Sequence, residues 1–159
     1  MTHYLIEELL VSAEIRHDRK IDAPSVFRFL ILHLAAFSVF FVGYSHIALA
    51  SLVVFYLIRY WGVSVVYHRY FSHKSFTTSR TFQFILGLIG TISGQRGPLW
   101  WAAGHRKHHR YSDTELDVHS PHNGSLFHSH IGWLLKKESL ETDYELVKDF
   151  AKYPEIMWL

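Results

Sequence analysis

Two long apolar runs dominate the hydrophobic pattern in the first half of the chain. The first covers residues 26–42 and the second covers residues 46–66, with a short turn over residues 43–45 between them. Each run is close to the ~20 residues that a helix rising ~1.5 Å per residue needs to cross a bilayer core. Buried helices of a soluble bundle are the alternative, but such helices seldom stay apolar on every face for so long. The pattern predicts an all-α membrane protein with a transmembrane helical hairpin.

The remaining sequence is more polar and predicts shorter elements. A charged segment over residues 1–23 precedes the hairpin, and we expect it to lie in the cytoplasm. Apolar residues recur at helical spacing over residues 82–92, a stretch too short to span and suited to an interfacial or internally packed helix. A glycine-containing break over residues 94–98 precedes a new helix, and residues 111–125 have loop composition. We therefore treat residues 24–159 as part of one domain.

The distribution of basic residues predicts the orientation of the hairpin. The turn that connects the two apolar runs contains no Lys or Arg. Basic residues flank the outer ends of both runs, and cytoplasmic flanks are typically the basic ones. They are Arg16, Arg19 and Lys20 before the first run, and Arg69, Lys74 and Arg80 after the second. Both ends of the hairpin, and the histidine-rich region within residues 67–159, are therefore predicted to face the cytoplasm.

Composition narrows the possible chemistry. A formal net charge of +2 gives no support for nucleic-acid binding. The absence of cysteine excludes iron–sulfur clusters and thiolate zinc sites within this chain. Histidine, in contrast, is abundant, with 13 among 159 residues. Imidazole nitrogens are therefore the main candidate ligands for a metal.

Two groups of histidines have spacings that favour a metal site. His105, His108 and His109 stand at positions i, i+3 and i+4, so a helix presents all three imidazoles on one side. His68 and His73 are five residues apart, which separates them by about 140° on an ideal α-helix. We expect this pair either to straddle the end of the second membrane helix or to serve two different ions. Neutral imidazoles with few carboxylates suit a first-row transition metal such as iron.

Other interpretations of the histidine groups remain open. The basic residues interleaved with His105–His109 also suit a patch that binds lipid headgroups. A structural or hydrolytic zinc site is a further alternative. For His119, His122, His128 and His130 we favour structural roles, or hydrogen bonds to metal ligands, over direct ligation.

The residues around both groups resemble those of membrane fatty-acid desaturases of the stearoyl-CoA-type Δ9 acyl class. The resemblance covers nearly all of residues 26–159. Its most specific part is the order of the two histidine boxes and their surroundings. The matching text is His68-Arg-Tyr-Phe-Ser-His73, Gly94-Gln95, Trp101-Ala-Ala-Gly-His105-Arg-Lys-His108-His109, Tyr111-Ser-Asp113-Thr-Glu-Leu-Asp117-Val-His119-Ser-Pro and Ser129-His130-Ile-Gly-Trp133.

The resemblance implies an O₂-dependent oxidoreductase that uses a diiron centre to place a cis double bond in a saturated acyl chain. The substrate would be an acyl-CoA or an acyl-lipid, and the electron donor a protein such as cytochrome b5, ferredoxin or rubredoxin. It implies that Gln95 and Trp101 shape the acyl tunnel, and we add that Asp113 and Asp117 orient ligand histidines. The implied metal ligands are His68, His73, His105, His108 and His109.

The chain departs from the family pattern in one serious respect. Family members continue with two more membrane helices and a third box, His-Asn-x-His-His, which this sequence lacks. Val118 also replaces the usual proline of the Asp-Pro-His-Ser stretch. We therefore expect the N-terminal half of a desaturase, inactive alone, which would come from a truncated gene, from a split protein with a separate C-terminal half, or from an incomplete piece of the protein. The alternatives are a non-catalytic membrane hairpin with a partial metal site, or a related lipid hydroxylase or desaturase of other regiochemistry.

Overall fold

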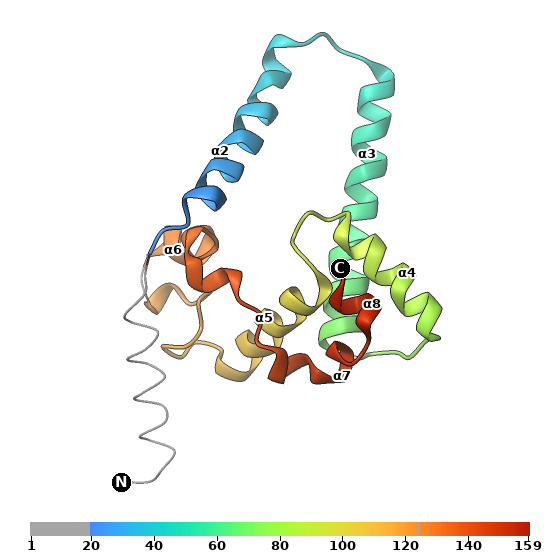
Figure 1. Ribbon diagram of the computed structural model, residues 1–159. Coiled ribbons are helices and arrows are strands. Elements are labelled where there is room, and N and C mark those ends of the chain that lie inside the picture. The colour runs from blue at the N-terminus through green and yellow to red at the C-terminus, as the bar shows by residue number, and fades with distance from the viewer. Residues whose placement is uncertain (1–19, 124) are drawn as a thin grey trace. The chain divides into compact units, whose positions relative to one another are not determined.

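The computed structural model describes residues 20–123 and 125–159, which form helices connected by turns and loops (Figure 1). This part of the chain contains an isolated bridge between Ile21 and Lys136 but no named strand, which confirms the predicted all-α class. Most of the predicted segment 1–23 lies outside the described residues. The chain divides into two compact units. One holds the described residues up to Val42 together with Arg110–Glu141, and the other holds Gly43–His109 together with Thr142–Leu159.

The first unit begins with an apolar helix, α2, over Ala23–Phe37, extended by the 3-10 turn η1 over Ser38–Phe41. Asp22 caps its start by accepting a hydrogen bond of 2.9 Å from the backbone N–H of Ser25. Proline in the first helical turn costs no hydrogen bond there, so Pro24 also favours a start at this point. The backbone N–H of Asp22 donates to the carbonyl of Leu135, 2.8 Å away, which joins the start of α2 to the later part of the unit.

The later described segment of the first unit, which follows α5, contains short helical turns. Their bounds are Pro121–Asn123 for η3, Leu126–His130 for α6, Gly132–Leu135 for η4 and Lys137–Leu140 for η5. Ser125 caps α6 through a hydrogen bond of 3.1 Å from the backbone N–H of His128. Short turns with side-chain caps fit the polar composition of this stretch, which cannot bury a continuous apolar face.

The second unit contains the longest helix, which changes its winding partway along. It runs as the α-helix α3 over His46–Trp61 and continues without a break as the π-helix η2 over Gly62–Ser72. The sequence predicted an end near residue 66, so the helix is longer than expected and includes His68. π-helices usually occur as single turns and often at functional sites, which makes an eleven-residue π segment unusual.

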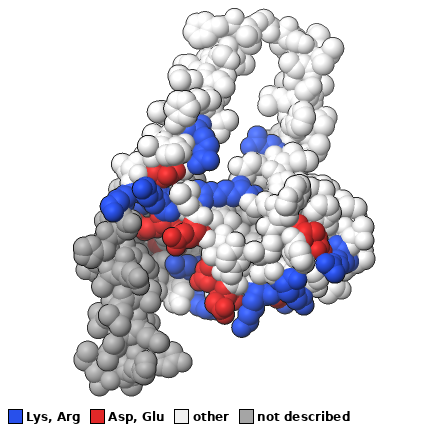
Figure 2. Space-filling model, viewed as in Figure 1, with Lys and Arg blue, Asp and Glu red and all other residues white. Residues whose placement is uncertain are grey.

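Within the part of the chain that the structure describes, two helices are long and apolar enough to cross a membrane. They cover Ala23–Phe41 and His46–Ser72, with mean hydropathies of 1.7 and 1.8. Only 6% and 11% of the residues in their most apolar windows are buried, so most of their apolar side chains lie on the surface. Residues 29–58 contain no Lys, Arg, Asp or Glu, and the outer parts of both helices are correspondingly uncharged in Figure 2. Exposed apolar surface of this extent fits lipid contact much better than water.

The core of the second unit forms where η2 meets the helices that follow it in sequence. α4 covers Arg80–Thr91 and packs against η2 through close approach at its glycines, with Gly90 against the ring of Tyr67. α5 covers Pro98–Tyr111, and a C-terminal group of turns covers the core with Val147 and Ile156. These turns are η6 over Tyr144–Val147, α7 over Lys148–Ala151 and α8 over Pro154–Met157. α4 therefore packs internally along the face that holds Leu86, Gly87 and Gly90, whereas Phe82, Ile85 and Ile92 of the same apolar stretch stay exposed on its other side.

Candidate metal centre

Four histidines converge at the junction of η2 and α5. The set consists of His68 and His73 from η2 and its end, and His105 and His109 from α5. Each offers one ring nitrogen, and these four nitrogens lie within 4.8 Å of one another. His68 and His105 are partly buried, whereas His73 and His109 are exposed. We call this set the four-histidine cluster.

The Nε2 atoms of the cluster are spaced as ligands of a shared ion would be. His73 Nε2 lies 3.1 Å from Nε2 of His68 and 3.1 Å from Nε2 of His105. His109 Nε2 lies 3.0 Å from Nε2 of His105. Two imidazoles that each sit ~2.0–2.1 Å from a tetrahedral ion have nitrogens roughly 3.3 Å apart. The donor set is all imidazole, which suits iron, zinc or copper better than magnesium or calcium.

The π-helical winding brings His68 and His73 together. In a π-helix each N–H bonds to the carbonyl five residues earlier. The backbone N–H of His73 donates to the carbonyl of His68 at 3.0 Å, so this pair itself closes such a turn. Their rings lie 4.5 Å apart between centroids, and both belong to one cluster. The pair thus straddles the end of this helix, which is the first of the two expected arrangements, and the α-helical angle of about 140° does not apply to this segment.

α5 supplies the other two histidines of the cluster and an aromatic neighbour. His105 and His109 are one α-helical turn apart, and Trp101 is one turn before His105. The indole of Trp101 stacks on the His105 ring at 4.8 Å and 22°, which restricts the tilt of that imidazole. The indole N–H donates to Oε1 of Gln95 at 2.9 Å. Gln95 and Trp101, predicted to act together, therefore contact each other directly.

His108 lies outside the four-histidine cluster. Its ring centroid is 6.3 Å from that of His105 and 5.7 Å from that of His109. It remains on the same helix, so its nitrogens can belong to a neighbouring ligand position but not to the group of four. Its predicted role as a metal ligand stays a prediction.

The electrostatics of the cluster favour neutral imidazoles. Burial lowers the pKa of His105 to about 3, and the neighbouring His109, His68, His73 and His108 add to the effect. Burial also lowers the pKa of His73, assisted by His68, His109 and Arg106. Neutral imidazole is the form that donates a lone pair to a metal, so both rings are held in the ligand form near neutral pH.

Asp113 and Asp117 belong to the other compact unit, in a loop that they organise themselves. Asp117 is 2% exposed and accepts hydrogen bonds from the backbone N–H groups of Asp113, at 3.0 Å, and His119, at 2.9 Å. Asp113 has a left-handed backbone with φ of 61°, a conformation that such side chain–backbone turns tolerate. The expected role of these carboxylates in orienting histidines stays a prediction.

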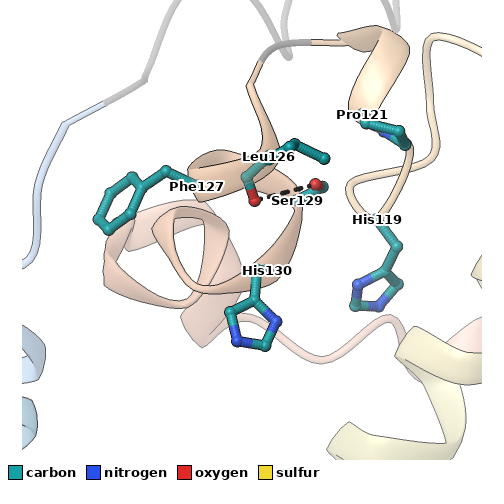
Figure 3. Close-up of a pocket in the computed structure, with 6 residues that line it drawn as sticks. All are labelled: His119, Pro121, Leu126, Phe127, Ser129 and His130. Carbon is teal, nitrogen blue, oxygen red and sulfur yellow. Dashed lines mark hydrogen bonds between the residues drawn. The ribbon is translucent and has the colours of Figure 1, made fainter.

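The first unit also contains an open hollow of about 670 Å³ (Figure 3). His119 and His130 stand on one side of it, and Ser129 donates to the carbonyl of Leu126 at 3.2 Å. The His119 ring meets Trp133 edge-on at 4.7 Å. The lining contains none of the cluster histidines; it consists of His119, Pro121, Leu126, Phe127, Ser129 and His130.

Two residues close to the cluster were not singled out from the sequence. Arg106 was read only as part of a basic patch, yet its guanidinium is largely buried and contacts Asp149, 43 residues later. Asp149 does not belong to any of the sequence motifs quoted above and lies in a stretch of mixed polar and apolar residues. Single-sequence patterns contain no signal for such a long-range pair.

A membrane-length apolar helix that ends in a cluster of imidazoles is the arrangement expected of a histidine-ligated membrane metalloprotein. Comparison with known families is more specific: the model of the fatty acid desaturase family matches residues 45–157. The chain belongs to the fatty acid desaturase family.

Individual relatives agree on the family and differ in the position of the double bond. The chain is 36% identical over 137 residues to an sn-1 stearoyl-lipid 9-desaturase of Anabaena variabilis, covering 82% of this chain and 49% of the relative. It is 37% identical over 103 residues to an sn-2 palmitoyl-lipid 9-desaturase of Nostoc sp. (strain 36), covering 62% and 36%. It is 31% identical over 118 residues to an icosanoyl-CoA 5-desaturase of Limnanthes douglasii, covering 74% and 33%. The chain thus spans between a third and a half of the length of these relatives.

Proposed function

We propose that this chain is the N-terminal half of a membrane acyl desaturase that introduces a cis double bond at Δ9 of a saturated acyl chain. The observation that carries the proposal is the convergence of Nε2 atoms from two separate histidine boxes. The two cyanobacterial relatives named as 9-desaturases support the Δ9 position. The reaction removes two hydrogens from adjacent methylenes, while O₂ takes these, two electrons and two protons to form two molecules of water.

The histidines of this chain would hold part of a diiron centre. His68, His73, His105 and His109 would supply the ligands that lie together, and His108 a further one beside them. Bound iron would supply the oxidising power that breaks an unactivated C–H bond with O₂. A C-terminal half outside this chain would complete the ligand set. Keeping the imidazoles neutral and fixed is the contribution of the residues described here.

The position of the double bond along the acyl chain has to be set by the shape of the acyl site, because a methylene offers no charge and no hydrogen-bonding group that the protein could bind. Trp101 and Gln95 are suited to form one wall of the acyl site. Trp101 stacks on the ligand His105 and is held by its hydrogen bond to Gln95, so its indole stays at a fixed place beside the metal ligands. A rigid wall next to the reactive centre determines which carbon pair reaches it. Asp113 and Asp117 would orient ligand histidines through their second ring nitrogens.

The two apolar helices would make this an integral membrane protein with its histidine boxes facing the cytoplasm. A soluble electron donor such as cytochrome b5, ferredoxin or rubredoxin would then reach the cluster from that side. The substrate would be an acyl-CoA or an acyl-lipid. Lys136 and Lys137 would also lie in the cytoplasm in this orientation and are suited to meet either the phosphates of a CoA thioester or lipid headgroups.

One specific observation favours a second candidate, a desaturase of other regiochemistry. The relatives include an icosanoyl-CoA 5-desaturase and, at 35% identity over 124 residues, a hex-5-enoyl-[acyl-carrier protein] acetylenase of Moorena producens. The histidine boxes would determine the oxidant, whereas the acyl tunnel would determine which pair of carbon atoms of the acyl chain reaches it. A non-catalytic membrane hairpin with a partial metal site is the remaining alternative.

A chimera tests the proposal. This chain would replace the matching segment of the Anabaena variabilis 9-desaturase, in a host without that activity, and the lipids would be analysed by mass spectrometry for double-bond position. We expect Δ9 monoenes and two bound iron ions, with both lost in a matched His105→Ala chimera. A double bond at another position would overturn the Δ9 assignment alone. A folded chimera that binds no iron and forms no monoene would support the non-catalytic alternative.

A further inference from the structure

Arg106 occupies an unusual place between two ligand histidines. It follows His105 on α5, and its side chain is only 21% exposed. A guanidinium has five N–H donors, and the contacts of Arg106 account for all five. Nε donates to the carbonyl of Ser72 at 2.9 Å and Nη2 to that of Phe71 at 2.6 Å. Nη1 donates to the carbonyl of Leu146 at 2.7 Å.

Asp149 completes this arrangement. Its two oxygens accept from Nη1 and Nη2 of Arg106 at 2.9 and 3.1 Å, a bidentate pair that fixes the plane of the guanidinium. Asp149 also lies 3.2 Å from Nζ of Lys74. Burial raises the pKa of Asp149, but Arg106 and Lys74 outweigh that effect, and the net shift is downward. The carboxylate is therefore ionised at neutral pH and offsets the positive charge beside the cluster.

Two of the three carbonyls bound by Arg106, those of Phe71 and Ser72, immediately precede His73. They are the last two of η2, and helix ends leave carbonyls that need outside donors. The Ser72 carbonyl belongs to the peptide bond that leads into His73, so holding it fixes the start of the His73 backbone. His73 is the residue whose Nε2 lies within 3.1 Å of both His68 and His105. A shift of this backbone would separate the two boxes.

We propose that Arg106, held in plane by Asp149, is a positioning residue that sets His73 from the first box against His105 and His109 from the second. This inference rests on the proposed metal-binding function of the cluster. It also gives the turns near the end of the chain a role at the metal site, because Asp149 lies in α7. Arg106 acts through the backbone of η2 and does not touch the reacting atoms.

We call the pair of Arg106 and Asp149 the clamp. The same unit provides a matched control for it, an ion pair with a purely structural role. Arg80 and Glu155 form a second bidentate pair, with distances of 2.7 and 2.9 Å, which joins α4 to α8. Neither of those helices carries a cluster histidine. Removing this pair should affect the stability of the unit while leaving the geometry of the cluster unchanged.

The experiment is a titration of the full chain in detergent micelles with Co²⁺, whose visible absorption reports the number and geometry of its ligands. The variants are Arg106→Lys, which keeps the charge but loses the planar fork, and Asp149→Asn, which loses the fixed charge; Glu155→Gln is the control. We expect the two clamp variants to bind Co²⁺ at least about tenfold more weakly and with altered absorption bands. Glu155→Gln should bind Co²⁺ like the wild type. Asp149→Glu, which keeps the negative charge, should bind Co²⁺ more tightly than Asp149→Asn.

Each other result counts against the proposal. Unchanged Co²⁺ affinity and spectrum in both clamp variants would overturn it while leaving the metal site of the proposed function standing. An equal loss in Glu155→Gln would show that affinity follows general stability. Loss of the folded far-UV circular dichroism spectrum in both clamp variants, with Glu155→Gln folded, would assign Arg106 to the fold alone. A wild-type chain that binds no Co²⁺ would overturn the metal site itself, and the positioning role with it.

Discussion

Substituting Gly90 by alanine tests how tightly α4 packs against the π-helix. A Cβ at this position would lie 2.3 Å from Cε1 and 2.8 Å from Cδ1 of Tyr67, whereas ordinary contacts begin near 3.4 Å. The ring would have to move by about 1.1 Å, the difference between 3.4 and 2.3 Å. Tyr67 is completely buried, and its hydroxyl donates to the carbonyl of Arg96, so it has little room to move.

The magnitude follows from a comparison with Gly104→Ala. Gly104 lies in the interior of α5, and a Cβ there would meet nothing within 4 Å. Replacing glycine by alanine within a helix stabilises it by up to about 1 kcal/mol, a gain open to both variants. Overpacking costs about 1–3 kcal/mol and applies only to Gly90. The free energy of unfolding of Gly90→Ala should therefore be lower than that of Gly104→Ala by about 1–3 kcal/mol.

The assay is unfolding of both variants in mixed micelles of increasing sodium dodecyl sulfate fraction, followed by tryptophan fluorescence and far-UV circular dichroism. Gly104→Ala should unfold at or above the wild-type midpoint and Gly90→Ala clearly below it. Equal midpoints for the two variants would refute the packing described between α4 and η2. In that case Tyr67 would have room that the structure does not give it.

Three further predictions concern other parts of the chain. The hydrogen bonds and charge of Arg80 lower the pKa of Glu155 to about 2 from an ordinary 4.5. Its stabilising effect is therefore complete above pH 4.5 and is lost as pH falls toward 2, so the difference in thermal midpoint between wild type and Glu155→Gln should shrink over that window; a constant difference would contradict this. Asp22→Ala removes the side chain that accepts a hydrogen bond from the Ser25 N–H, so it should lower the free energy of unfolding by about 0.5–2 kcal/mol, measured as a lower thermal midpoint by circular dichroism. Asp22→Asn should retain most of the stability, and an equal loss in both variants would contradict the capping role. Removing bound metal with a chelator should lower the free energy of unfolding by about 2.7 kcal/mol if free metal had stood at 100 times its Kd; an unchanged midpoint would argue against metal binding by the folded chain.

Periodicity and spacing predicted much of the fold and of the candidate site. The apolar runs gave two long helices, and the spacing of His105 and His109 placed both on one side of α5, because regular α-helical geometry needs only local sequence. The contact between Gln95 and Trp101 is also local, since only six residues separate them. These features depend on interactions within a turn or two of the chain.

Features that depend on tertiary packing were not predictable in the same way. An angle calculated for an α-helix separated His68 from His73, but that segment is wound as a π-helix against α4. Propensity scales contain no signal for that winding. The pairing of Arg106 with Asp149 spans 43 residues, and a single sequence does not indicate which carboxylate a given arginine meets. Spacing alone also placed His108 with its neighbours, whereas the group of four ring nitrogens that lie within 4.8 Å of one another does not include His108.

The wider winding of η2 has a consequence for recognising metal sites in other sequences. Searches for helical ligand pairs look for separations of three or four residues, which is the rule for an α-helix. The two candidate ligands His68 and His73 are five residues apart, and the backbone N–H of His73 donates to the carbonyl of His68. Deleting one residue between them would return the pair to α-helical spacing, and would test whether the π winding is needed for the pairing. A separation of five between histidines at the end of an apolar helix is thus a search pattern in its own right.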